Sequence, residues 1–377
     1  MKKLAIIGAS YLQEPVIRKA QEMGVETHVF AWECGDIGEK IADHFYPISI
    51  VEKDVILKKC QEIRIDGICT IASDLAAITV NYVANAMGLV GNSMECTEKS
   101  TNKHAMRNCF AAHGDPSPKS YLVQNADDLT VELSYPVIVK PLDRSGSRGI
   151  TKVTDSTQLQ AAIDNAKAQG FLKEALVEEF AVGQEYSVEC ISWEGQHHFL
   201  ALTHKFTTGA PNFIETGHME PAPVDEDTYT RVKDVVFHAL DSLQIRYGAS
   251  HSELKIAEDG TIRLIEIGGR MGGDFIGSAL VEATTGVDFV KAVIDVALGN
   301  KPQWDTKSTG VAAVRFVFNQ ADLDILNELK KTAPQYFVAS NVEELDDRTV
   351  TDSASRFGYF LMRADNLSAL LPYLPKE

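Results

Sequence analysis

A predicted β-hairpin in the second half of the chain restricts the fold more than any other feature. Residues 249–273 read ASHSELKIAEDGTIRLIEIGGRMGG. Asp259-Gly260 is typical of a two-residue turn with positive φ at both positions, and strand-like residues flank it on both sides. With that turn, the pairing predicts Leu254 opposite Ile265 and Glu253 opposite Glu266.

Two glutamates directly opposite each other would repel, because the Cβ atoms of such a pair lie about 4.5–5.5 Å apart. A hard divalent cation bound by both carboxylates removes the repulsion, and Mg²⁺ suits a site where phosphates supply the other ligands. Alternatively, one glutamate points to solvent, or a bulge shifts the register. Arg270 follows Glu266 by four residues in a glycine-rich segment, and its guanidinium would suit a phosphate or carboxylate. The hairpin therefore predicts a metal site formed by Glu253 and Glu266.

The acidic composition limits the partners that the chain can bind. A formal net charge of −17 and a pI near 5.1 argue against nucleic acids and anionic membranes. The 377 residues, 45% of them hydrophobic, suit two or three domains. The first apolar run stops at Gly8, which predicts a strand rather than a signal peptide, and no run is long enough to span a membrane. Six scattered cysteines without metal-ligand spacing indicate reduced thiols in a cytoplasmic protein.

Strand and helix patterns alternate along the first hundred residues. Strands are expected at 3–8, 26–31 and 67–71, and helices around 16–23, 54–62 and 75–87. This order predicts a parallel sheet with right-handed crossovers. Gly8 stands alone where a dinucleotide fingerprint needs three glycines, which favours a structural turn. Ser73 and Asp74 follow the carboxyl end of a strand, so they are expected to cap the next helix or to contact a substrate.

The remaining chain has a mixed pattern. A helix predicted at 97–110 ends before Gly114-Asp115-Pro116-Ser117-Pro118, which indicates a hinge. A small α+β module of about 70 residues follows, with strands at 136–140, 150–153 and 175–179 and a helix at 157–167. Later strands are expected at 185–192, 199–204, 310–318 and 356–363, and helices at 227–243, 277–297, 323–331 and 368–374.

Lys140 ends the apolar strand PVIVK, directly before a loop of small residues, Ser145-Gly146-Ser147-Arg148-Gly149. A lysine at the end of a buried strand is costly unless its charge is used, and backbone N–H groups in a glycine loop can bind an anion. Together they predict a phosphate site. The lysine precedes the loop, so this is not a Walker A motif. The alternative is a solvent-exposed lysine beside a surface loop.

Two other segments are expected to contact ligands. The strand and turn LVEEFAVGQE, residues 176–185, can offer backbone groups to an adenine edge and a carboxylate to ribose hydroxyls. Residues 204–223 look too irregular for a core strand, so Glu215 and His218 are candidate amine contacts, with an ordinary surface loop as the equal alternative. His251 could also touch substrate, although a lone histidine is more often structural.

In combination, these motifs resemble the ATP-grasp superfamily. The resemblance rests on the order of STNKHAMR, VIVKPLDRSGSRGI, LVEEFAVGQEYSV and SELK…LIEIGGRMGG, and it extends to SASRFGYFLMRAD near the end. Within the superfamily the chain is most similar to carboxylate–amine ligases, including L-amino acid ligases, with a relation to carbamoyl phosphate synthetase large subunits and biotin carboxylase.

The resemblance implies an α/β fold of ATP-grasp architecture. We expect an N-terminal parallel-sheet domain at 1–96, an ATP-grasp domain at 97–303 with a small α+β lid at about 119–186, and a C-terminal α+β subdomain at 304–377. The central mixed sheet would carry the metal hairpin. The implied cofactors are ATP and Mg²⁺, the partners are small-molecule carboxylate and amine substrates, and a homodimer is expected.

The resemblance also implies roles for individual residues. Lys103 and Lys140 would contact ATP phosphates, beneath the loop from Ser145 to Gly149. Glu178, Glu179 and Phe180 would lie along the adenine, and Glu185 on the ribose. Glu253 and Glu266 would bind Mg²⁺, while Arg270 and Lys140 would act on the reacting phosphoryl group.

One position departs from the family pattern. The family often has Glu-x-Asn in the second metal strand, and Gly268 stands here at the third position. An oxygen ligand is then missing, so either the site holds one Mg²⁺ or a second ion relies more on Glu266 and phosphate oxygens. Alternatively, Gly268 and Gly269 allow substrate to approach the backbone. The expected activity is acyl phosphate formation followed by capture by an amine. The alternatives are an ATP-grasp enzyme that uses bicarbonate and a non-catalytic ATP sensor.

Overall fold

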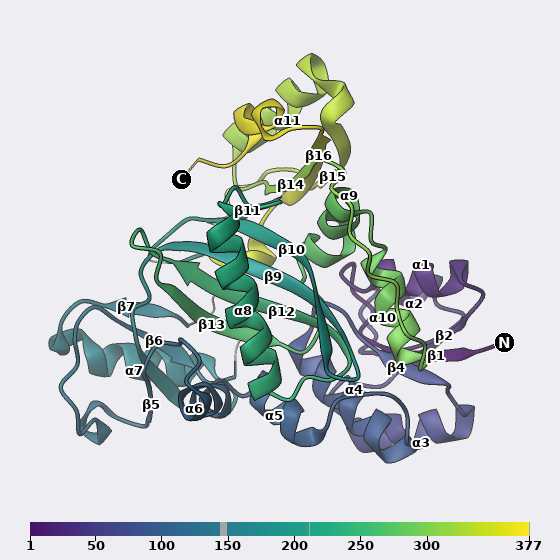
Figure 1. Ribbon diagram of the computed structural model, residues 1–377, viewed down its shortest axis with the longest axis horizontal. Coiled ribbons are helices and arrows are strands. Elements are labelled where there is room, and N and C mark those ends of the chain that lie inside the picture. The colour runs from purple at the N-terminus through teal and green to yellow at the C-terminus, as the bar shows by residue number, and fades with distance from the viewer. Residues whose placement is uncertain (144–148, 211, 377) are drawn as a thin grey trace.

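The computed structural model describes residues 1–143, 149–210 and 212–376 (Figure 1). The strands are β1 Lys3–Ile7, β2 Glu26–Ala31, β3 His44–Pro47, β4 Gly67–Cys69, β5 Ser120–Val123, β6 Val137–Pro141, β7 Thr151–Val153, β8 Ala175–Glu179, β9 Gln184–Trp193, β10 Gln196–Thr207, β11 Glu215–Glu220, β12 Gly248–Ile256, β13 Ile262–Gly268, β14 Val311–Phe316, β15 Phe337–Val342 and β16 Gly358–Ala364. The α-helices are α1 Glu14–Glu22, α2 Ile37–Ile41, α3 Lys53–Ile63, α4 Asp74–Met87, α5 Met94–Thr101, α6 Lys103–His113, α7 Leu159–Gln169, α8 Glu226–Ser242, α9 Val281–Thr285, α10 Phe289–Ala297 and α11 Gln320–Thr332.

The N-terminal sheet is parallel, as the alternating pattern predicts. Its order is β3-β2-β1-β4, and β1 pairs in parallel with both β2 and β4. Figure 1 shows this unit beside the central sheet, and α10 packs between them against β4 and β12. One apolar core joins the two parts, because Ile6 and Val29 cluster with Phe289 of α10 and Ile191 of β9. The N-terminal sheet is therefore packed firmly against the central one.

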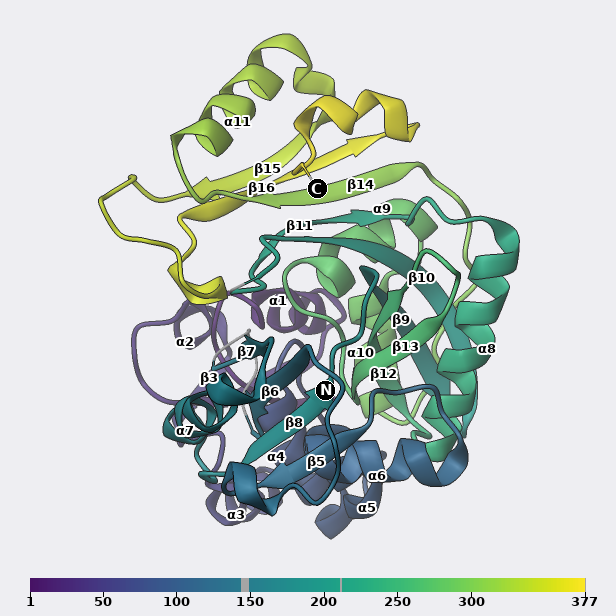
Figure 2. The same ribbon diagram turned by 90° about the vertical axis from the view of Figure 1, so that its left-hand side faces the viewer.

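A second, antiparallel sheet has the order β5-β8-β6-β7 and is covered by α7. Its core contains Val137, Val139 and Val177 from the strands and Ile163 from the helix. This sheet projects to one side of the molecule in Figure 1, and it is seen in front of the N-terminal helices in Figure 2. It places Lys140 on β6 next to Glu178 on β8.

The central sheet has eight strands in the order β13-β12-β9-β10-β11-β14-β16-β15. We expected a mixed sheet, but its neighbouring strands in the described residues all pair antiparallel. The strands after residue 310 continue this sheet through β11 and β14, and α11 covers them at the top of Figure 2. Helix α8 crosses the other half of the sheet and packs on β10.

The hairpin β12–β13 pairs Glu253 with Glu266, as predicted, although the turn and the register of the intervening residues differ from the prediction. The predicted two-residue turn is wrong. Ala257 bonds to Thr261, Gly260 N donates to Ala257 O, and within the turn only Gly260 has positive φ. This is a type I turn followed by a glycine in the left-handed region, which forms a three-residue loop.

A β-bulge in β13 compensates for the longer turn. The predicted pairing of Leu254 with Ile265 is wrong, because Leu254 pairs with Leu264 and the register then shifts before Glu253 and Glu266. Ile265 is the extra residue, and its carbonyl accepts a hydrogen bond of 2.6 Å from Arg107 instead of completing the ladder. The sequence pattern carries no signal of this bulge.

Other predicted elements also differ. The helix predicted at 97–110 is two helices, because Asn102 leaves the helical conformation and caps α6 by accepting from His104 N and Ala105 N. Residues 204–223 are not an irregular loop, since they include the end of β10 and the six-residue strand β11. The single helix predicted at 277–297 is divided into three elements. It begins with a π-helical turn, η3 Ile276–Leu280, continues as α9, which ends at Gly286, and resumes as α10.

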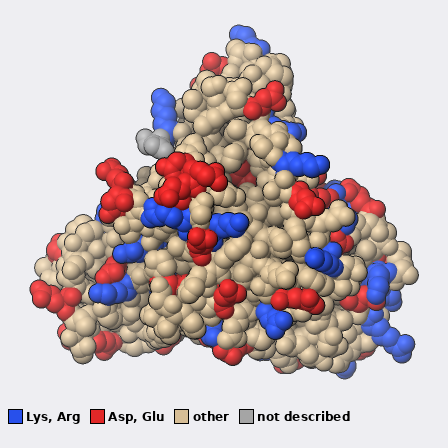
Figure 3. All heavy atoms as spheres, viewed as in Figure 1, with Lys and Arg blue, Asp and Glu red and all other residues tan. Residues whose placement is uncertain are grey.

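The surface agrees with the composition. On the face in Figure 3, basic side chains alternate with acidic ones rather than forming a broad basic area. Within the described ranges, no helix combines the length and the apolar character needed to cross a membrane.

Candidate active site

A cavity of about 390 Å³ lies where the N-terminal sheet, the small antiparallel sheet and the central sheet meet. Most of the residues singled out from the sequence line it. These are Ser73, Lys103, Lys140, Glu178, Glu179, Phe180, Glu185, Glu215, His218, His251, Glu253, Glu266, Gly268 and Arg270. The fold therefore brings together side chains, such as those of Ser73 and Arg270, that are nearly 200 residues apart in the sequence.

The paired hairpin glutamates each face a buried lysine. Lys103, the first residue of α6, places Nζ 2.8 Å from Glu266 Oε1, and Lys205 on β10 places Nζ 2.6 Å from Glu253 Oε1. Burial would lower the pKa of Lys103, but Glu266 raises it above its usual value. Burial would raise the pKa of Glu253, but Lys205 holds it well below its usual value. Glu253 is therefore an ionised oxygen donor, and with Glu266 opposite it the hairpin offers two carboxylates, which are ligands that Mg²⁺ prefers.

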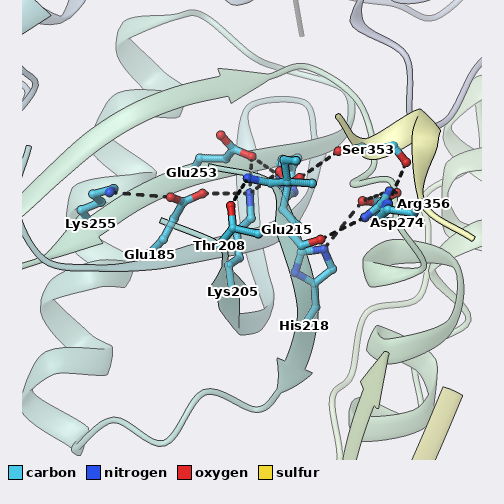
Figure 4. Close-up of polar contacts among 12 residues, drawn as sticks. Glu185, Lys205, Thr208, Glu215, His218, Glu253, Lys255, Asp274, Ser353 and Arg356 are labelled. Carbon is cyan, nitrogen blue, oxygen red and sulfur yellow. Dashed lines mark hydrogen bonds and ion pairs between the residues drawn. The ribbon is translucent and has the colours of Figure 1, made fainter. Parts of the chain in front are cut away.

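Lys205 is the centre of a larger acidic cluster, which Figure 4 shows. Its Nζ also lies 3.2 Å from Glu185 and 3.8 Å from Glu215, and its side chain is only 3% exposed. Glu253, Glu185 and Glu215 raise the pKa of Lys205 well above its ordinary value despite burial. This lysine is a permanent buried cation among three carboxylates.

Lys140 lies in a separate ion-paired group on the small sheet. Its Nζ is 2.6 Å from Glu178 Oε2, and Glu178 Oε1 is 3.0 Å from Arg107 Nε. Burial would raise the pKa of Glu178, but Arg107 and Lys140 lower it to about 2. The pKa of Lys140 is lowered by burial and by the neighbouring cations Arg107 and Lys103. Because the Glu178 side chain holds Lys140, only its backbone remains for the expected adenine contact, which stays a prediction.

Arg270 is held by an aspartate from the N-terminal sheet. Its Nε and Nη2 each donate a hydrogen bond of 2.8 Å to Asp74, the first residue of α4. A Cβ at position 268 would lie 2.4 Å from Asp74 Oδ1, so the glycine that departs from the family pattern is required by this carboxylate. Ser73 caps the same helix by accepting from Ala76 N at 3.2 Å, as one of its two predicted roles required.

His251 and Glu189 form a buried pair behind the β12–β13 hairpin. His251 Nδ1 contacts Glu189 Oε1, and Nε2 lies 3.4 Å from Glu253 Oε1. Burial would lower the pKa of His251, but Glu189 raises it to about 8. Glu189 Oε2 also accepts from the N–H of Gly272 at 2.9 Å, so it fixes the segment after Arg270. His251 is thus anchored in the cavity wall beside Glu253.

The candidate amine contacts lie on β11, opposite the C-terminal segment. Glu215 Oε2 accepts from Ser353 Oγ at 2.9 Å, and His218 Nε2 lies 4.0 Å from Asp274 (Figure 4). Arg356 Nη2 donates to both oxygens of Asp274, at 3.0 and 2.9 Å. Burial lowers the pKa of His218, which favours the neutral ring.

The phosphate loop is only partly described. Ser145, Gly146, Ser147 and Arg148 lie outside the described residues, and Gly149 is present with φ +72° but does not line the cavity, whereas Ile150 does. Gly269 lines a second cavity, of about 60 Å³, rather than the main one.

Phe180, on the cavity wall, lies between two lysines. Lys152 Nζ is 3.9 Å from the centre of its ring and Lys255 Nζ is 5.7 Å away. Glu185, which was predicted to contact the ribose, is ion-paired in this structure. Its carboxylate lies 3.8 Å from Lys255 Nζ and 3.2 Å from Lys205 Nζ.

Several residues of this site were missed from the sequence, chiefly Arg107, Glu189, Lys205 and Asp274. Lys205 had a usable signal: it lies in the apolar strand FLALTHKFT, so the argument that found Lys140 applies equally to it. Glu189 had none, because its partners are distant in the chain and come together with it only through the packing of the sheets. The position of Asp74 after a strand was recognised, but its pairing with Arg270 had no signal in the sequence.

Part of the chain matches a known domain family. Residues 133–278 match the model of the ATP-grasp domain. The chain therefore contains an ATP-grasp domain, and its three sheets have the ATP-grasp architecture.

The similarity to known proteins covers more of the chain than residues 133–278. The chain is 26% identical to alanine–anticapsin ligase of Bacillus subtilis over 298 residues, which cover 69% of this chain and 62% of that protein. It is 21% identical over 274 residues to the N-terminal section of the carbamoyl phosphate synthase large chain of Methanopyrus kandleri, covering 69% and 48%. The crystal structure of L-amino acid ligase from Bacillus licheniformis superposes with a TM-score of 0.84 at 24% identity, covering 99% of this chain and 96% of that one. The chain spans about three fifths of the length of the first curated relatives that it matches.

Proposed function

We propose that this protein is an ATP-dependent ligase that activates a carboxylate as an acyl phosphate and couples it to an amine, with release of ADP and phosphate. The observation that carries the proposal is the direct pairing of Glu253 with Glu266 in a cavity that also holds Lys103, Lys140 and Arg270. The ATP-grasp domain and the similarity to alanine–anticapsin ligase support the same reaction class.

The donor set fits Mg²⁺ and a nucleotide triphosphate. Glu253 and Glu266 would hold the metal, and the ion would neutralise charge on the phosphates. Lys103 and Lys140 are buried cations within reach of the same space, so they would bind phosphate oxygens. Phe180 and the backbone after β8 would contact the base, and Glu185 the ribose.

Positioning and charge stabilisation would supply most of the catalysis. The substrate carboxylate attacks the γ-phosphate in line, while Arg270 and Lys140 stabilise the negative charge that spreads over the transferred group. The amine then displaces phosphate from the acyl group, so no nucleophilic serine or cysteine is needed. The small sheet around β6 and β8 would close over the nucleotide and exclude water that hydrolyses the acyl phosphate.

The amine and acid would bind between the hairpin and the C-terminal segment. Glu215, His218 and His251 line this end of the cavity, and Ser73 and Gly268 would approach the substrate from the N-terminal side. We propose amino acids as the substrate class, because carboxylate and basic side chains alternate here and can meet both an ammonium and a carboxylate group. The six cysteines are free thiols, which supports our proposal of a cytoplasmic location.

A product screen tests the proposal. The protein is incubated with ATP, Mg²⁺ and the twenty amino acids, singly and in pairs, and ADP, phosphate and new amide products are measured. We expect ADP formation that depends on two substrates and equals the amount of amide. ADP formation with bicarbonate alone would favour the carboxylase alternative, and nucleotide binding without ADP formation under any mixture would favour the sensor.

A further inference from the structure

A cluster of Glu26, His28 and His44 lies on the edge of the N-terminal sheet, outside the cavity described above. Glu26 and His28 alternate on β2, so their side chains share one face, and His44 on β3 pairs directly with His28. One ligand atom from each of the three lies within 4.8 Å of the others. None of the three is among the residues that line the main cavity.

The contacts around one carboxylate oxygen resemble an unfilled coordination shell. Glu26 Oε1 lies 3.2 Å from His28 Nε2 and 3.0 Å from His44 Nε2. Zinc ligands at bond lengths of about 2.0–2.1 Å in a tetrahedron are roughly 3.4 Å apart. Both distances are therefore close to the separation of two ligands on one ion, and the two histidine nitrogens lie within 4.8 Å of each other.

The ring of His28 gives the strongest indication. Its side chain is only 4% exposed, and its buried Nε2 has no hydrogen-bond partner within the described residues. Nδ1 lies 3.1 Å from the hydroxyl of Tyr46, which can fix the tautomer as a second-sphere partner does for a metal-bound histidine. If Nδ1 carries the proton, a bare lone pair on Nε2 faces the Glu26 carboxylate. A cation between them removes that repulsion.

One rearrangement is required. The rings of His28 and His44 are stacked, with centroids 4.7 Å apart and planes at 14°, whereas one ion must lie in the plane of each ring. His44 has a side chain 50% exposed, so it has room to rotate, while Tyr46 holds His28 in place. We propose that Glu26, His28 and His44 form a binding site for a divalent transition-metal ion of the zinc class.

A second acidic cluster, Cys34, Asp36 and Glu39, does not compete as a candidate. Glu39 Oε1 already accepts backbone N–H groups from Cys34, Gly35 and Asp36 at 2.7, 2.7 and 3.0 Å, which leaves it little capacity for an ion. The carboxylate has a capping role in the loop before α2. Replacing Cys34 by serine removes the sulfur ligand of this cluster, so that Cys34 cannot contribute to zinc binding in the titration described below.

The test is a zinc titration of the full chain, freed of metal with EDTA, in the Cys34→Ser background and with excess Mg²⁺ to occupy the active-site carboxylates. Competition with a chromophoric chelator gives stoichiometry and affinity, and Co²⁺ absorbance reports the ligands. We expect one zinc per chain. His44→Ala and Glu26→Gln should each weaken binding at least tenfold, and Tyr46→Phe by about tenfold or more.

The matched control is His238→Ala. His238 is 60% exposed and pairs with Asp115 at 2.7 Å, but among the described residues it belongs to neither cluster of three possible metal ligands, so its loss should leave zinc affinity unchanged. Because His44 is half exposed, circular dichroism should show a folded His44→Ala protein. No zinc binding at micromolar concentration, or equal affinity in wild type, His44→Ala and Glu26→Gln, would overturn the proposal. Nucleotide binding is measured separately and does not depend on this site.

Discussion

Replacing Gly268 by alanine should break the ion pair between Asp74 and Arg270. The new Cβ would lie 2.4 Å from Asp74 Oδ1 and 3.2 Å from Arg270 Nε. A normal contact needs about 3.5 Å, so the carboxylate must withdraw by about 1 Å. Hydrogen bonds that are now 2.8 Å long would then exceed bonding distance.

The expected cost follows from the burial of this pair. Asp74 and Arg270 have side chains 21% and 15% exposed, so the carboxylate can move toward the cavity and recover some hydration. We expect Gly268→Ala to lower the free energy of unfolding by about 1–3 kcal/mol, as overpacking does. Asp74→Ala should cost about 3 kcal/mol or more, because Arg270 remains buried without its partner.

A double-mutant cycle measures the coupling. In the Asp74→Ala background the new methyl group has no carboxylate to meet, so Gly268→Ala should change the unfolding free energy by less than about 0.5 kcal/mol. Urea unfolding of the four proteins, without ligands, gives the cycle. Gly269→Ala is the matched control, because its Cβ would lie an ordinary 3.4 Å from Ser100 Oγ. Costs that add to within about 0.5 kcal/mol would refute the steric argument.

Three further predictions concern charged groups in and behind the cavity. Glu266→Gln should reduce ADP formation by about 100-fold or more while nucleotide affinity changes less than tenfold, as measured by coupled assay and calorimetry; full activity would remove the metal assignment. Lys205→Met should lower unfolding free energy by about 3–5 kcal/mol, since three carboxylates lose a buried cation, whereas Lys59→Met at the exposed pair with Glu62 should change it little. Burial raises the pKa of Glu220 from its ordinary value of 4.5 to about 8. Between these two pH values Glu220 is protonated in the folded chain and ionised in the unfolded chain. Stability should therefore fall with rising pH between about 5 and 8, by at most about 1.4 kcal/mol per unit, and Glu220→Gln should remove this slope in urea unfolding at several pH values; an unchanged slope would contradict it.

Local patterns predicted the parts of this fold that local chemistry determines. The alternation of strands and helices gave the parallel N-terminal sheet, and the position of Lys140 at the end of a strand placed it in the cavity. The pairing of Glu253 with Glu266 was also correct, but two errors of one residue cancelled in reaching it. The turn is one residue longer than Asp-Gly suggests, and a bulge at Ile265 restores the register.

The remaining features depend on contacts between distant segments. The bulge is stabilised by Arg107, whose guanidinium bonds to Ile265 O, and no pattern within the hairpin records that donor. Likewise, Gly268 read alone indicates a lost metal ligand, whereas Asp74 shows why a side chain is excluded there. These two residues are 194 positions apart in the sequence, and only the packing of the N-terminal sheet onto the central one brings them together.

From the ion pairs of the cavity we predict that a metal ion and a nucleotide bind together. Lys103 is paired with Glu266, and Lys205 with Glu253, so a nucleotide that draws Lys103 onto its phosphates leaves Glu266 without a cation unless Mg²⁺ arrives with it. A fully buried carboxylate without a partner costs about 3–5 kcal/mol. The side chains of Glu266 and Glu253 are about a quarter exposed, which reduces this cost. Removing Mg²⁺ with EDTA should therefore weaken ATP binding by about 10- to 100-fold in calorimetry. The loss should be much smaller in Glu266→Gln, where no charge is stranded. Equal Mg²⁺ dependence in both proteins would show that the metal acts on the phosphates alone.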